Sequence, residues 1–89
     1  PRPLERAGPG IGRRLLERDA EGHRLWLVRV APGAAVPWHK HTGTELTFFL
    51  SGAFRDNRGL YRPGDLREYC GDEADRLECS GRDAGMGLL

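Results

Sequence analysis

The chain has 89 residues, which is enough for one domain and too few for two independent cores. Its 38% apolar and 30% charged residues and its net charge of +1 indicate a soluble globular domain and argue against a disordered one. The 14 Lys and Arg are scattered among 13 Asp and Glu, so no direct nucleic-acid contact is expected. The chain begins without a signal-peptide pattern and has no apolar run of about 18 residues, so we expect no membrane contact. A cytoplasmic location is therefore expected.

Turn residues divide the chain into short segments of strand-like composition. Residues 1–12 are rich in Pro and Gly and are expected to form an extended lead-in, with residues 13–89 as the domain. No segment of helical length has a 3.6-residue period, so an all-β sandwich or barrel is predicted. The expected strands cover residues 13–18, 23–31, 34–41, 45–50, 53–55, 60–62, 66–69, 76–80 and 86–89.

The aromatic residues Trp26, Phe48 and Phe49 stand in strand-like segments and are expected to fill the core. Two cysteines, Cys70 and Cys79, lie outside any Cys-x-x-Cys spacing and are expected to be free thiols.

Residues 33–52 hold the densest group of chemically active side chains. His39 and His41 are two positions apart, so in a strand both imidazoles project to the same face. Glu45 follows after Gly43, where a turn or bulge would bring its carboxylate to the two imidazoles. Two histidines and one carboxylate form a facial set of metal ligands that leaves positions open for water or substrate.

The spacing of this stretch resembles the first motif of the cupin family, G-x5-H-x-H-x3-E-x6-G. The motif is met by Gly33, His39, His41, Glu45 and Gly52. The surrounding residues, APGAAVPWHKHTGTE and the later YRPGD, are more narrowly similar to the C-terminal cupin domain of ChrR-type anti-sigma factors. The resemblance covers roughly residues 13–89 and implies a small cupin-type β-barrel, also described as a double-stranded β-helix or jelly roll.

The second cupin motif, G-x5-P-x-G-x2-H, is poorly kept. Counting from Gly64 places Cys70, Asp72 and Asp75 at its proline, glycine and histidine positions. The resemblance therefore implies Asp75 as the fourth ligand, beside His39, His41 and Glu45. The family points to zinc, whereas two imidazoles and two carboxylates would suit Mn²⁺ or Fe²⁺ equally well.

The resemblance implies a metal-binding sensing or regulatory domain of a transcription regulator. A small-molecule ligand is expected, and a sigma factor would be contacted only through regions outside this chain. The alternative function is a small non-haem, dioxygenase-like metal enzyme, with the first three ligands as its facial triad. Trp38 flanks His39 and is expected on the exterior, at the interface of a homodimer. His23 is expected to face solvent at a hairpin, without a role as ligand.

Overall fold

The computed structural model describes residues 3–36, 44–70 and 76–88. Two stretches inside the chain lie outside this description: the β4–β5 connection, residues 37–43, and the β8–β9 connection, residues 71–75. The strands are β1 (Glu5–Gly8), β2 (Ile11–Arg18), β3 (Arg24–Val30), β4 (Ala35–Val36), β5 (Thr44–Ser51), β6 (Phe54–Asp56), β7 (Gly59–Tyr61), β8 (Leu66–Cys70), β9 (Leu77–Cys79) and β10 (Gly85–Leu88).

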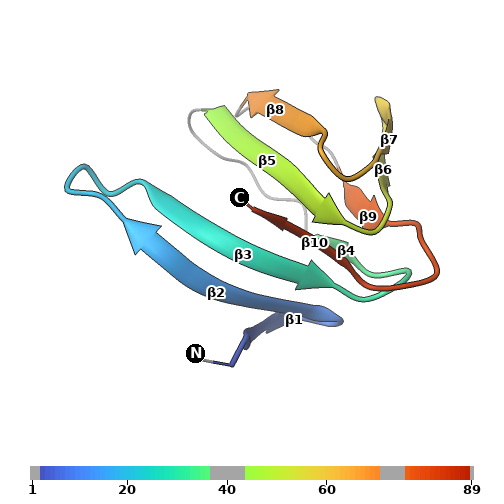
Figure 1. The fold of residues 1–89 in the computed structure, drawn as a ribbon, viewed down its shortest axis with the longest axis horizontal. Coiled ribbons are helices and arrows are strands. Elements are labelled where there is room, and N and C mark those ends of the chain that lie inside the picture. Colours follow the sequence, from blue (N-terminus) through green and yellow to red (C-terminus); the bar gives the residue numbers. More distant parts are fainter. Residues whose placement is uncertain (1–2, 37–43, 71–75, 89) are drawn as a thin grey trace.

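The strands form two antiparallel sheets (Figure 1). The larger sheet has the order β1-β2-β3-β10-β5-β8 and the smaller sheet the order β4-β9-β6-β7. In Figure 1 the β2–β3 hairpin extends well past the smaller sheet. The described residues contain no helix, and so none that could cross a membrane. The prediction of an all-β architecture is confirmed.

Strand β1 lies within the segment that was expected to be an extended lead-in. It pairs antiparallel with β2, with Glu5 opposite Arg13 and Arg6 opposite Gly12. These residues therefore form the outer edge of the larger sheet.

The core lies between the two sheets. Its buried side chains come from β2, β3 and β5 on one side and from β6 and β9 on the other: Ile11, Val28, Val30, Phe49, Phe54, Leu77 and Cys79. The Phe49 ring stacks on Tyr61 at 4.8 Å between centroids and meets Phe54 at 5.1 Å. Cys79 is a buried free thiol, as expected for it; the side chain of Cys70 lies outside the description.

The prediction that both phenylalanines of β5 fill the core is wrong for one of them. Phe49 is 1% exposed and Phe48 is 39% exposed. Neighbouring residues of a strand point to opposite faces of the sheet, so only one of the two can enter the core. Trp26, on β3, is half-buried and packs at the edge of the core.

Candidate metal centre

Glu45 begins the inner face of β5. Thr47 and Phe49, two and four positions further, are 2% and 1% exposed, whereas Leu46, between Glu45 and Thr47, is 51% exposed. Side chains two positions apart share a face of a strand, so Glu45 belongs to the inward-facing set. Glu45 as a whole is half-buried, at the end of β5 that adjoins the β4–β5 connection.

The β4–β5 and β8–β9 connections run side by side at their ends, because the strand residues that flank them are paired at both ends. Val36, the last residue of β4, pairs with Leu77, the first residue of β9. Thr44, the first residue of β5, pairs with Cys70, the last residue of β8. Each connection therefore links this strand pair of the smaller sheet to this strand pair of the larger sheet. Their ends in the larger sheet, Thr44 and Cys70, lie next to Glu45, which pairs with Tyr69.

Three of the four predicted ligands belong to these two connections. His39 and His41 lie in the β4–β5 connection and Asp75 in the β8–β9 connection, so all three are outside the described residues. Of the predicted set, the structure places Glu45 alone. The full ligand set stays a prediction, and so does the exterior position of Trp38, which lies in the same stretch as the histidines.

A buried ion pair lies two positions along the strands from Glu45 and Tyr69. Arg67 pairs in register with Thr47, and its Nε donates to Asp56 Oδ2 at 2.7 Å. The two side chains are 6% and 0% exposed. The hydroxyl of Tyr61 donates to the same carboxylate oxygen at 2.8 Å. This ion pair ties β8 of the larger sheet to the β6–β7 hairpin of the smaller one.

The second oxygen of Asp56 holds the β6–β7 turn. Its Oδ1 accepts the backbone N–H groups of Arg58 at 2.8 Å and Gly59 at 3.2 Å. Residues 56–59 connect the expected strands 53–55 and 60–62, which indicated a turn, but the ion pair was not predicted. A signal was present, because alternation along residues 66–69 places Arg67 on the face opposite Leu66.

These contacts also shift the pKa values of Asp56 and Tyr61. Burial opposes the charge of Asp56, but the hydrogen bonds from Arg67, Tyr61 and the Arg58 backbone outweigh it, so the pKa of Asp56 lies below 3.8. Burial, together with the hydrogen bond to Asp56, raises the pKa of Tyr61 above 10.0. Asp56 is therefore an anion at neutral pH, already held by a cation.

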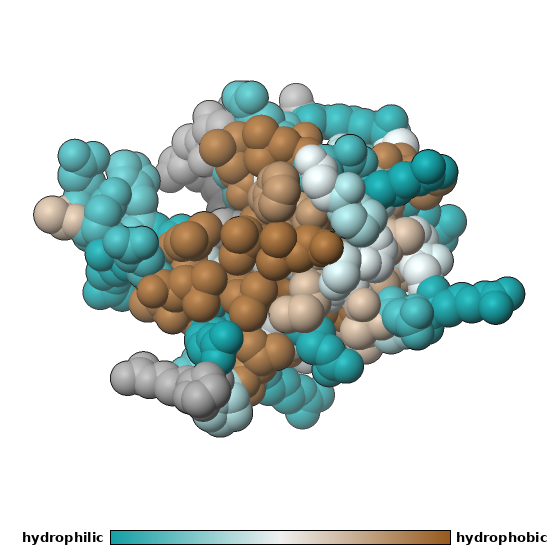
Figure 2. Space-filling view, in the orientation of Figure 1, coloured by the Kyte–Doolittle hydropathy of each residue, from teal (hydrophilic) through white to brown (hydrophobic). Residues whose placement is uncertain are grey.

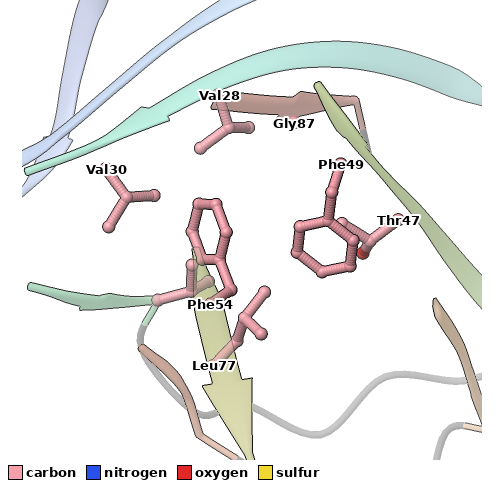
Figure 3. A pocket seen from close by; sticks show the side chains of 8 residues that line it. Val28, Val30, Thr47, Phe49, Phe54, Leu77 and Gly87 are labelled. Atoms are coloured by element: carbon pink, nitrogen blue, oxygen red, sulfur yellow. The ribbon is translucent and has the colours of Figure 1, made fainter. Parts of the chain in front are cut away.

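A small apolar space lies between the sheets (Figure 3). Its size is about that of one water molecule, and Thr47 carries a hydroxyl at its wall. This hydroxyl oxygen is buried and has no hydrogen-bond partner among the residues that the structure describes. The walls are otherwise apolar: Val28, Val30, Val36, Phe49, Phe54, Leu77 and Gly87. The space is a packing gap of the core and is too small for an organic ligand.

A second group of potential metal ligands lies at the β2–β3 turn. One ligand atom each of Asp19, Glu21 and His23 lies within 4.8 Å of the others, and all three residues are exposed. Asp19 Oδ1 accepts the backbone N–H groups of Glu21 and His23, both at 2.9 Å. Its Oδ2 shares a 2.9 Å hydrogen bond with His23 Nδ1, which lowers the pKa of Asp19. These contacts explain the cluster as a turn cap, and His23 is solvent-facing, as predicted.

Comparison with known proteins gives a family for most of the chain. Residues 2–80 match the family described as the ChrR Cupin-like domain. The anti-sigma-E factor ChrR of Cereibacter sphaeroides is 39% identical over 61 residues, which cover 66% of this chain and 27% of the relative. The chain thus spans about a quarter of that protein.

Solved structures agree with this match. The crystal structure of Rhodobacter sphaeroides SigE in complex with the anti-sigma ChrR aligns with a TM-score of 0.86 and 28% identity, over 96% of this chain and 45% of that one. KdgF from Halomonas sp. aligns with a TM-score of 0.78 over 98% of this chain and 85% of that one. At 17% identity, this second likeness concerns the fold alone. The predicted cupin-type fold is confirmed.

Proposed function

Because the chain belongs to the ChrR Cupin-like domain family, which it matches over residues 2–80, we propose that it is a metal-binding sensing domain of an anti-sigma type transcription regulator. The single observation that carries the metal site is the placement of Glu45. The half-buried Glu45 begins the inner face of β5, next to the pair Thr44 and Cys70, at which one end of each ligand-bearing connection lies.

The proposed ligands are His39, His41, Glu45 and Asp75. One end of each connection, Thr44 and Cys70, is fixed by backbone pairing beside Glu45. Chain connectivity therefore favours a common site for all four ligands. Imidazole and carboxylate donors suit Zn²⁺, Mn²⁺ and Fe²⁺, and we propose Zn²⁺ as the first ion to test. A bound divalent ion would act as a Lewis acid toward a small ligand that carries an oxygen or nitrogen donor.

The described residues around Glu45 would support such a site in two ways. The buried Arg67 is neutralised by Asp56 at 2.7 Å, which reduces its repulsion of a nearby cation. The ion pair also joins β8 to the smaller sheet, so it fixes one of the two strands that lie beside the site. Asp56 and Arg67 are therefore positioning residues in this proposal.

Metal titration of the purified domain tests the site. We expect one tightly bound Zn²⁺ per chain by isothermal titration calorimetry, and a loss of affinity of at least about 100-fold in Glu45→Gln. The matched control is Glu68→Gln on β8, an exposed residue of the outer face, which should bind as the wild type does. Melting temperatures of both variants without metal show whether each still folds.

The same titration separates the proposed site from the β2–β3 turn cluster. His23→Ala removes the imidazole of that cluster and should leave the affinity within about twofold, because the cluster is exposed and its carboxylate already caps the turn. Lost binding in His23→Ala together with retained binding in Glu45→Gln would move the metal to the turn and contradict the proposal.

The regulatory part of the proposal concerns the natural chain as a whole. The ChrR relative is an anti-sigma factor, and this chain covers 27% of its length, so a sigma factor contact is assigned to regions outside this chain. Such a regulator would act in the cytoplasm, where sigma factors work. The complete reading frame is the test: a domain with a sigma-binding role beside this one is expected, and a gene that encodes this domain alone would contradict the regulatory role.

A further inference from the structure

The inner face of the larger sheet continues past the core along the β2–β3 hairpin. On β3, the buried Val28 is followed on this face by Trp26 and then by Arg24, each two positions further. Figure 2 shows that the protruding end of the hairpin is hydrophilic. The part of the inner face beyond Val28, together with the β2 residues that pair with it, is called the arginine face: Arg13, Leu15, Arg18, Arg24 and Trp26.

The outermost pair of the arginine face sets two like charges opposite each other. Arg18 pairs in register with Arg24, and side chains at such positions stand about 5 Å apart on one face. Both residues are exposed, and neither has a carboxylate partner among the residues that the structure describes. The nearest acids in the sequence are placed elsewhere, because Asp19 caps the turn and Glu17 lies on the outer face. Like charges in this arrangement repel each other, so an anion between them would be stabilising.

A third guanidinium of the arginine face is held in place by an aromatic ring. Arg13 Cζ lies 4.3 Å from the centroid of the Trp26 ring, which packs at the edge of the core. A guanidinium stacked in this way keeps its N–H groups free at the rim, and their planar fork matches the two oxygens of a carboxylate. Leu15, 38% exposed, pairs with Trp26, so an apolar surface lies between the charges.

Strand register places the arginine face across the sheet from Glu45. Gly87 on β10 pairs with Val28 on β3 and with Phe49 on β5. Counting four positions back along both strands puts Arg24 and Glu45 in one row of the inner face. Because β10 lies between β3 and β5, two strand spacings separate their backbones, about 10 Å in all. The arginines and the carboxylate therefore border the same space from opposite sides.

We propose that the arginine face binds the carboxylate of a small organic acid, and that this acid is the ligand that the domain senses. The proposal rests on the metal site proposed at Glu45, beside which the ligand would lie. Its carboxylate would contact Arg13 and Arg24, and its apolar part would lie on Trp26 and Leu15. An inorganic anion would satisfy the arginines but leave this apolar surface unused, which favours an organic acid.

Calorimetric titration of the zinc-loaded domain with benzoate tests the ligand class. Benzamide is the matched control, because it has the same shape without the charge. We expect a Kd on the order of 1 mM for benzoate and at least about tenfold weaker binding of benzamide. Sulfate should also bind at least several-fold more weakly than benzoate, since it has no apolar part. Benzamide or sulfate that binds as tightly as benzoate would overturn the organic-acid assignment.

Two arginine variants test the assigned residues. Arg24→Gln and Arg13→Gln should each weaken benzoate binding about tenfold, whereas their zinc affinity should stay within about threefold of the wild type. The matched control is Arg29→Gln, an exposed residue of the same strand on the outer face, which should bind benzoate as the wild type does. Circular dichroism confirms that each variant is folded. Equal benzoate affinities in Arg24→Gln and Arg29→Gln would overturn the proposal.

The two titrations separate the arginine face from the metal site. A wild type that binds zinc but not benzoate overturns this inference and leaves the metal site standing. A wild type that binds no zinc contradicts the proposed function instead. The benzoate titration is therefore repeated on metal-free domain, where weaker binding in Arg24→Gln than in Arg29→Gln supports the arginine face and equal binding overturns it.

Discussion

Replacing Asp56 by alanine is expected to lower the free energy of unfolding by about 3–5 kcal/mol. The side chain of Arg67 is 6% exposed, so the variant would remove the Asp56 counter-charge from a buried guanidinium. The same change removes the acceptor of the Tyr61 hydroxyl and of two backbone N–H groups in the β6–β7 turn. Urea unfolding followed by tryptophan fluorescence measures the loss.

A matched control separates the loss of the buried ion pair from the loss of turn hydrogen bonds. Asp65 is exposed, and its Oδ2 accepts the Arg62 N–H at 2.8 Å, whereas the buried Arg67 Nε donates to Asp56. Asp65→Ala should therefore cost only about 1 kcal/mol. If Asp56→Ala cost no more than Asp65→Ala, the ion pair would contribute nothing beyond its turn contacts, and its proposed positioning role would be lost.

Because of the Asp56 carboxylate, the free energy of unfolding is expected to fall at acid pH. The pKa of Asp56 is lowered from 3.8 in the folded chain, so its contribution is fully present above that value. It is lost as the pH falls from about 4 through the lowered pKa, because protonation favours the unfolded state. The free energy of unfolding of the wild type, compared with Asp56→Asn between pH 5 and 2.5, should show this slope in the wild type and a smaller one in the variant.

Gly52→Ala is expected to destabilise the fold by about 2–4 kcal/mol, through backbone strain and steric overlap together. Gly52 has a φ of +79°, which residues with a Cβ rarely adopt. A Cβ there would lie 2.6 Å from the Cα of Gly85, at the start of β10. Gly85 cannot easily move away, since it is itself packed against the Phe54 ring. Thermal unfolding followed by circular dichroism measures the effect.

The other glycine that frames the motif is the natural control. Gly33 has a φ of +78°, but a Cβ built on it meets no atom of the described residues within 4 Å, apart from those of its chain neighbours. Gly33→Ala should thus show the backbone cost alone, about 1–2 kcal/mol. Equal losses in the two variants would mean that the close approach to β10 adds nothing at Gly52.

Local patterns in the sequence were enough to predict the all-β architecture. Two-residue alternation and the Pro, Gly and Asp turns predicted strands that overlap β2 to β10, since both signals depend only on near neighbours. Strand β1 was missed, because it was expected to be an extended lead-in. The motif spacing identified Gly52, and the structure supplies its reason in the contact with Gly85. Alternation applied strictly to β5 would also have placed Phe48 outside the core.

Long-range partners could not be predicted in the same way. Asp56 and Arg67 are 11 residues apart and meet only because β6 and β8 belong to different sheets that face each other. The alignment of the arginine face with Glu45 likewise depends on β10, the last strand, lying between β3 and β5. No local signal gives that order. For the metal site, the motif spacing predicted the candidate ligands, and the structure adds the position of Glu45 and of the connection ends.

Elemental analysis of the domain purified without added metal tests the central claim most directly. We expect close to one divalent ion per chain in the wild type and a near-complete loss in His41→Ala, because a four-ligand site rarely survives the removal of an imidazole. Asp75→Ala, measured alongside, reports whether the aspartate completes the set. A wild type without bound metal, or a His41→Ala variant that keeps its full metal content, would contradict the proposed site.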